Sequence, residues 1–472
     1  MATDPLRIHL SLVSHTNIGK TTLARTLLSR DIGEVADRAH VTETTEDYVL
    51  ARNNEGCELI LWDTPGFGNS VALAKRLDGR SNPVGWFLSE VWDRMANKTQ
   101  WLNQKALKHV KDTSSIVLYL VNATELPDTA PYVQAEMRIL EWIGKPVIVL
   151  LNQIGVPRPA HAEKADVERW QNAMRAYPIV NSVLSMDAFA RCWVQEFTLF
   201  DAIHKALSPD QLPAFEALRE VWSRQRRAAY SSSIQALSLY LDKLINDREN
   251  AETPSMVDQF KFWGKRLGLV KQQDAHDPTE AAQTALSARS VDDFCTLTDK
   301  LIAANGLKGK GVRKTILTRM QTDWKVSNPV DPKHAAAAGA IGTGAAGGLV
   351  ADLATGGLSL GLGTLIGTVV GALGGAGLAV AYNQKKEAQG TVVTWSDSAV
   401  KNFFTDAVLL YLAIAHFGRG RGNWEEGEYP AFWRETVEET LKHHQLETKH
   451  LPSAFDSVIR EILCQLYPDA QF

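Results

Sequence analysis

The stretch from Ile8 to Leu28 constrains the fold more than any other part of the chain. Apolar residues at its start predict a strand, a short polar turn that contains Gly19 follows, and a helix is expected from Thr22 onward. This order of strand, glycine-containing loop and helix is typical of a phosphate-binding loop, because the first backbone N–H groups of a helix are unpaired and can surround an anion. The sequence therefore predicts a nucleotide site at the end of its first strand.

The residues of this turn have distinct expected roles. Lys20 would reach the β and γ phosphates, the Thr21 hydroxyl would bind Mg²⁺, and Gly19 would keep the backbone close to the phosphates. Ser14 replaces the glycine that the motif places five residues before Gly19, and serine is small enough for that position. The expected nucleotide-binding residues of this segment are Ser14, His15, Thr16, Asn17, Ile18, Gly19, Lys20, Thr21 and Thr22.

A polar segment from Asp31 to Asp47 follows the first helix and contains several threonines. In nucleotide-dependent switches, a threonine of this region closes over Mg²⁺ and the γ phosphate and moves away after hydrolysis. Thr44 and Thr45 are equal candidates for this role in catalysis, and we place Thr45 among the expected metal ligands.

The strand-like run after this segment ends in an Asp-Thr-Pro-Gly sequence at residues 63–66. An acidic residue at the end of a strand is where a second anchor for Mg²⁺ is needed, and a glycine N–H three residues later can contact the γ phosphate. We therefore expect Asp63 to be a metal ligand, and Lys20 and Gly66 to act on the γ phosphate during hydrolysis.

These motifs resemble those of the Era-like GTPases, which belong to the translation-factor class. The resemblance rests on His15-Thr16-Asn17 before the Ile-Gly-Lys-Thr turn and on the Asp-Thr-Pro-Gly sequence. It implies an enzyme that hydrolyses GTP, with GTP, GDP and Mg²⁺ as its ligands. A glycine-rich apolar segment near the C-terminus adds a likeness to bacterial GTPases whose C-terminal domain has no assigned function, which implies membrane association.

Phe67 stands where Ras-like proteins have a glutamine that orients the attacking water. A phenyl ring cannot orient water, so we expect slow intrinsic turnover unless another group, a partner or a conformational change supplies this function. A plain packing role for Phe67 is compatible with the same expectation.

An Asn-Gln-Ile-Gly sequence at residues 152–155 occupies the place of the guanine-reading motif Asn-Lys-x-Asp. Asn152 is kept, but Gly155 replaces the aspartate that would accept two hydrogen bonds from guanine. The resemblance favours GTP, and ATP or mixed use is the alternative. Asp187 follows the last strand-like run and either supplies the missing carboxylate or caps the next helix.

Strand-like and helical segments alternate through the first part of the chain. Continuous apolar runs at residues 115–121 and 146–151 are suited to buried parallel strands, and helical spacing covers residues 83–109 and 132–142. This alternation predicts an α/β P-loop NTPase domain with a doubly wound, mostly parallel sheet over residues 5–208.

After residue 208 the pattern becomes helical without obvious strands. One long helix or two is expected over residues 215–246, and an apolar helix over residues 399–417. The expected divisions are a helical region, a glycine-rich apolar hairpin and a C-terminal helical region, at residues 209–334, 335–382 and 383–472.

The hairpin is the most unusual segment, because Asp352 is the only charged side chain between Lys333 and Lys385. Glycines recur every four residues from Gly363 to Gly375, which places them on one helical face and permits self-association. Its second helix could span a hydrocarbon core of about 30 Å, and the flanking lysines fit entry from the cytoplasm. The hairpin predicts a cytoplasmic protein at the inner face of the cell membrane, peripheral or hairpin-inserted; the alternative is a hairpin packed inside its own domain.

The net charge of −4 gives no global basic field, so DNA is not expected and RNA is not favoured. Two other functions stay open: an RNA-binding assembly factor, as some Era-like proteins are, and a scaffold that binds nucleotide with little hydrolysis. The chain begins without a secretory signal, and its four widely spaced cysteines predict buried free thiols in a reducing compartment.

Overall fold

A six-stranded sheet lies at the centre of the N-terminal half, in the order β2-β3-β1-β4-β5-β6. The strands are β1 (Arg7–Ser14), β2 (Glu46–Arg52), β3 (Glu58–Asp63), β4 (Ile116–Asn122), β5 (Val147–Asn152) and β6 (Val180–Ser185). Only β2 is antiparallel to its neighbour, and the other pairs are parallel. The computed structural model describes residues 5–29, 45–90, 98–155, 157–190, 192–251, 280–309, 391–395, 397–418, 430–444 and 450–472.

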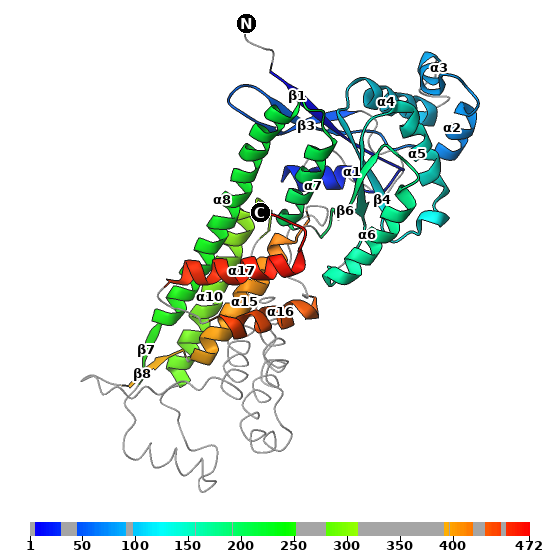
Figure 1. Cartoon of the computed structure of the whole chain (residues 1–472). Helices are drawn as coiled ribbons and strands as arrows, with labels where there is room; N and C mark the ends of the chain where they lie inside the picture. The colour runs from blue at the N-terminus through cyan, green and yellow to red at the C-terminus, as the bar shows by residue number, and fades with distance from the viewer. Residues whose placement is uncertain are drawn as a thin grey trace, which may run out of the picture.

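Helices cover both faces of this sheet, which confirms the doubly wound α/β fold (Figure 1). One face carries α2 (Ser70–Leu77), α3 (Pro83–Ser89), α4 (Lys98–Asp112), α5 (Pro131–Ile143) and α6 (Ala160–Met174), and a short 3-10 turn (Pro127–Thr129) precedes α5. The other face carries α1 (Lys20–Leu28), α7 (Trp193–Ala206) and the first part of α8 (Leu212–Asn246).

The parallel strands are apolar on both faces because both faces are covered by helices. In β4, for example, Leu118 belongs to the apolar cluster under α1 and α7, whereas Val117 and Val121 belong to the cluster under α4 and α5. Successive side chains of a strand point to opposite faces, so a continuous apolar run fills two cores at once.

The helix α8 joins the sheet to the helical C-terminal region as one continuous helix of 35 residues (Figure 1). Its neighbours there are α10 (Glu280–Ala304), α15 (Asp397–Ala415) and α17 (Leu451–Leu466), and α16 (Ala431–His443) packs against α15 and α17. A single apolar cluster runs from β1 and β3 through α7 and α8 into α15 and α17. The proposed division at residue 208 stays a prediction, and no break in the apolar core accompanies it among the described residues.

Three local predictions differ from the structure. The helix after the first strand begins at Lys20, two residues earlier than expected, because the loop turns sharply at Gly19. The single helix expected over residues 83–109 is interrupted, since α3 ends at Ser89 and α4 begins at Lys98. Of the four cysteines, all free, Cys464 is exposed rather than buried.

A short antiparallel pair in the helical region was not predicted. It joins β7 (Arg248–Ala251) to β8 (Thr391–Thr394). Each strand has four residues, too few for a recognisable alternation, and the partner lies far along the chain. The pair brings the end of α8 next to the start of α15.

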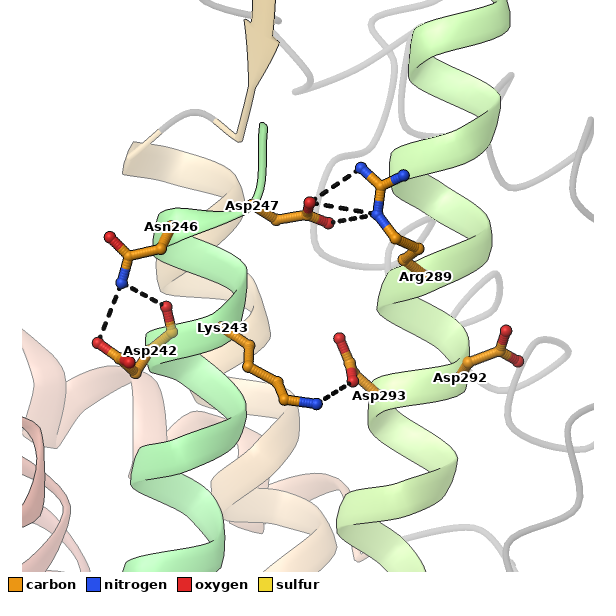
Figure 2. A pocket seen from close by; sticks show the side chains of 7 residues that line it. All are labelled: Asp242, Lys243, Asn246, Asp247, Arg289, Asp292 and Asp293. Carbon is orange, nitrogen blue, oxygen red and sulfur yellow. Dashed lines mark hydrogen bonds and ion pairs between the residues drawn. The ribbon is translucent and has the colours of Figure 1, made fainter. Parts of the chain in front are cut away.

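An open pocket of about 550 Å³ lies between α8 and α10, at the end of α8 that is remote from the six-stranded sheet (Figure 2). Lys243 Nζ donates to Asp293 Oδ1 at 2.9 Å, and the Arg289 guanidinium donates to the Asp247 carboxylate. These ion pairs join the two helices, so the pocket is a charged contact between them and lies apart from the predicted nucleotide site. It is lined by Asp242, Lys243, Asn246, Asp247, Arg289, Asp292 and Asp293.

The glycine-rich hairpin at residues 335–382 lies outside the described residues, as does the expected switch segment up to Thr44. In the part of the chain that the structure describes, no helix combines the length and apolar character needed to cross a membrane.

Candidate functional site

The loop between β1 and α1 has the backbone shape that a phosphate-binding loop requires. Asn17 and Gly19 both adopt a positive φ, of 64° and 94°, which turns the backbone sharply before α1 begins. A Cβ atom at Gly19 would lie 2.7 Å from Asn152 Nδ2. Glycine is therefore needed at this position for its backbone conformation and for lack of space.

Lys20 is buried beside this loop and points toward the end of β3. Its Nζ donates to Ser14 Oγ at 3.1 Å, and a Cβ atom added at Gly66 would lie 2.9 Å from the same Nζ. Burial lowers the pKa of Lys20, and the nearby Asp63 carboxylate opposes this shift. The structure thus places the Lys20 ammonium group next to Gly66, and these are two of the residues predicted to act on the γ phosphate.

The two strongest predicted metal ligands lie side by side. Thr21 Oγ1 donates to Asp63 Oδ2 at 2.5 Å. The other carboxylate oxygen, Oδ1, is buried and has no hydrogen-bond partner among the described residues. Burial raises the pKa of Asp63, and Lys20 and Thr21 lower it. A hydroxyl and a carboxylate with a spare buried oxygen fit Mg²⁺, which prefers oxygen ligands.

The third predicted metal ligand, Thr45, is half-buried and immediately precedes β2. The next residue, Glu46, pairs in register with Asp63 of β3. Thr45 therefore lies near the strand end that carries Asp63, while Thr44 falls outside the described residues.

The segment after Asp63 is fixed against the phosphate-binding loop. Thr64 Oγ1 donates to the Leu12 carbonyl at 2.6 Å, and the Phe67 N–H donates to the Ser14 carbonyl at 2.9 Å. The Phe67 side chain is fully buried in the cluster under α2 and α3. Phe67 is thus a packing residue, a role that is compatible with the expected slow turnover.

Asn152 connects the phosphate-binding loop to the segment after β6. Its side chain is fully buried, its Nδ2 donates to the Ile18 carbonyl at 2.6 Å, and its Oδ1 accepts from the Ala188 N–H at 2.8 Å. The neighbouring Gln153 donates to the Asn17 carbonyl at 3.3 Å. The side-chain amides of these two adjacent residues, at the end of β5, therefore hold this side of the site.

Asp187 lies against the sequence that replaces the guanine-reading motif. Its Oδ2 accepts from the N–H groups of Ile154 and Gly155, at 2.5 and 3.0 Å. Its Oδ1 accepts from the Phe189 N–H at 2.7 Å. The expectation that Asp187 caps a helix is wrong, because Cys192 is the N-cap residue of α7.

A buried carboxylate behind the loop was missed in the sequence. Glu136 of α5 is fully buried and binds His15 Nδ1 at 2.8 Å, and its other oxygen accepts from the Tyr119 hydroxyl at 2.8 Å. The signal was present, because Glu136 interrupts the apolar face formed by Val133 and Leu140 of the same helix. This network holds the second residue of the loop in place.

Two parts of the chain match known families. Residues 9–153 match the family described as 50S ribosome-binding GTPase, and residues 328–457 match a domain of unknown function named DUF3482. The first match covers the whole phosphate site described above and ends at Gln153. Among curated proteins, none matches this chain.

Several solved structures are similar over parts of the chain. Era in complex with MgGDPNP and a segment of 16S ribosomal RNA is 16% identical, with a TM-score of 0.31 over 54% of this chain and 75% of that one. A variant of Aquifex aeolicus Era bound to GDP and AlF4⁻ is 15% identical, with a TM-score of 0.31 over 62% of this chain and 90% of that one.

These TM-scores are low, so the assignment rests on the sheet order, the loop geometry and the family match. All three agree with the motifs that predicted an Era-like GTPase, including the asparagine, lysine and threonine of the loop. Residues 9–153 therefore belong to a P-loop GTPase domain, and the C-terminal region contains a domain of unknown function.

Proposed function

We propose that this protein is a slowly hydrolysing GTP switch, with Mg²⁺ as cofactor, whose nucleotide state governs membrane association or partner recruitment through its C-terminal region. The observation that carries the proposal is the convergence of Lys20, Thr21 and Asp63 on the loop between β1 and α1. A hydrogen bond from Asn152 to the Ile18 carbonyl connects this loop to the side of the site where a base would lie.

The phosphates would be held by the backbone N–H groups at the start of α1 together with Lys20. The Lys20 ammonium lies within 3.1 Å of Ser14 Oγ, so it is already oriented across the mouth of the loop. As charge develops on the γ phosphate during hydrolysis, the Lys20 ammonium and the Gly66 N–H would stabilise it.

Thr21 and Asp63 are the residues that would hold Mg²⁺, and Thr45 is the proposed third ligand. These residues would hold the ion beside the phosphates, where its positive charge would offset theirs. The Thr21 hydroxyl donates to Asp63. This hydrogen bond keeps both side chains close to the positions that the ion requires.

Slow hydrolysis follows from the burial of Phe67. Its ring packs in the cluster under α2 and α3 and offers no polar atom to a water molecule. Removing a positioned water-orienting group costs GTPases several orders of magnitude in rate, unless a partner restores the function. We therefore expect fast GTP hydrolysis only when a partner or a conformational change supplies a group that orients the attacking water.

Guanine recognition would depend on Asp187 in place of the missing aspartate. Its carboxylate accepts hydrogen bonds from the N–H groups of Ile154 and Gly155, so it lies close to the position from which a side chain at residue 155 would extend. A Cβ atom at Gly155 would meet nothing within 4 Å, which leaves open space beside this carboxylate. These observations support GTP over ATP.

The proposed output is tested by co-sedimentation with vesicles of phosphatidylethanolamine and phosphatidylglycerol. We expect the full chain to bind more in a non-hydrolysable GTP analogue than in GDP, or the reverse, and a variant lacking residues 335–382 to bind in neither. The deletion variant must still bind GDP, which shows that its GTPase domain is folded.

Two results would contradict this output. If the full chain stays in the supernatant in both nucleotides, the hairpin packs within the protein and does not contact membranes. If binding is equal in both nucleotides, the membrane contact is not governed by the switch.

A further inference from the structure

The C-terminal region touches the GTPase domain at the segment that follows β6. Gly418, three residues after the end of α15, donates its N–H to the Phe189 carbonyl at 3.1 Å. A Cβ atom at Gly418 would lie 2.0 Å from the Ala188 carbonyl oxygen and 2.7 Å from its carbon. The two backbones are therefore so close that only glycine fits at position 418.

The segment that Gly418 contacts, residues 187–189, lies on the side of the proposed nucleotide site where the base would bind. The Ala188 N–H donates to Asn152, and Asp187, the residue before it, holds the N–H groups of Ile154 and Gly155. A displacement of Ala188 would therefore loosen contacts on two segments that line the site. Gly418 lies directly behind those contacts.

The same segment is also tied to the phosphate side of the site. The Ala188 carbonyl accepts from Thr26 Oγ1 of α1 at 3.0 Å. Just beyond it, Trp193 Nε1 at the start of α7 donates to the Tyr411 hydroxyl of α15 at 3.0 Å. The segment is thus clamped between α1, which carries the phosphate-binding loop, and α15.

We propose that Gly418 is a positioning residue for guanine nucleotide binding, through which the C-terminal region sets the rate of nucleotide release. The inference rests on the proposed nucleotide site and extends it, since it assigns control of that site to the domain of unknown function. When α15 is seated, Ala188 and Asp187 are held and the base is retained. When α15 shifts, the base side opens and the nucleotide leaves.

The test is the rate of release of a fluorescent N-methylanthraniloyl GDP from the full chain, measured by stopped flow. Gly418→Ala must push Ala188 away, and we expect release at least about fivefold faster, the lower end of ordinary coupling between sites. Gly144→Ala is the control, because a Cβ atom at this position, at the end of α5, would meet nothing within 4 Å, even though its φ of 75° makes alanine strained there. We expect wild-type release rates from this control.

A second measurement does not depend on the variant folding. Coupling between two sites is reciprocal, so GDP should slow hydrogen exchange in the last turns of α15 in the wild-type chain. Unchanged exchange there, or a folded Gly418→Ala variant that releases GDP at the wild-type rate, would overturn the inference. Failure of the proposed nucleotide site looks different, because the wild-type chain would then bind no labelled GDP at all.

Discussion

On the side of the proposed site where the base would bind, the aspartate of the guanine-reading motif is missing, and an aspartate from another loop lies nearby. Position 155, where the guanine-reading motif has an aspartate, is a glycine, and the carboxylate of Asp187, on a different loop, accepts from the N–H groups of Ile154 and Gly155. The sequence showed both residues, but it could not show that they meet, because 32 residues and a strand separate them. On the phosphate side, the Thr21–Asp63 hydrogen bond and the approach of Lys20 to Gly66 join residues that the motifs already pointed to, and their roles toward phosphate and Mg²⁺ stay predictions.

Asp187→Asn tests this replacement. Asparagine replaces one of the two carboxylate oxygens by an NH₂ group and removes the charge, so either the N–H groups of residues 154–155 or the Phe189 N–H loses its acceptor. We expect GDP affinity to fall about tenfold or more, in line with the 1.5–3 kcal/mol of a charge-assisted hydrogen bond, and ADP affinity to stay unchanged. Isothermal titration with GDP and ADP measures both.

The exposed Asp210, in the turn between α7 and α8, offers a matched control, because Asp210→Asn makes the same chemical change away from the site. If Asp187→Asn bound GDP as tightly as the Asp210→Asn control, Asp187 would have no part in reading the base.

At the scale of elements, α8 is the connection between the two halves of the molecule. Its Arg226 donates to Glu196 of α7 at 2.9 Å, to Ser29 Oγ at 2.7 Å and to the Leu27 carbonyl at 2.9 Å. The last two groups end α1, just before the expected switch segment. One guanidinium thus joins α8 to both helices on this face of the sheet.

Arg226→Ala should destabilise the protein by about 3 kcal/mol, because Glu196 is almost fully buried and would lose its cation. Urea unfolding followed by circular dichroism measures the change. Arg224→Ala is the control on the same helix, since Arg224 is exposed and pairs with an exposed glutamate. Exposed pairs contribute at most about 1 kcal/mol, so equal effects of the two substitutions would refute this role for Arg226.

The elements themselves were predictable to different degrees. The buried parallel strands and α8 were recognised because long apolar or periodic runs specify them locally. The β7–β8 pair and the contact of Gly418 with Ala188 were not, because each depends on residues far apart in the sequence. Tertiary contacts of this kind produce no periodic pattern of apolar residues in either segment.

For the whole molecule, one apolar cluster joins the sheet, α8 and the C-terminal helices. A rearrangement at the phosphate site can therefore reach the C-terminal region through packed elements rather than through a linker. Two contacts reach the last turn of α1, from Arg226 directly and from Gly418 through Ala188, and they define where that coupling would pass. This architecture supports a switch in which the two regions respond as a unit.

The central claim is that the loop at Lys20 binds guanine nucleotide, and equilibrium titration of the full chain with fluorescent GDP and GTP tests it most directly. We predict saturable binding by the wild-type chain and loss of at least about a hundredfold in affinity in Lys20→Ala, because the buried ammonium faces the phosphates. Lys75→Ala, at an exposed position of α2, should bind as the wild type does. Unchanged affinity in Lys20→Ala would contradict the account.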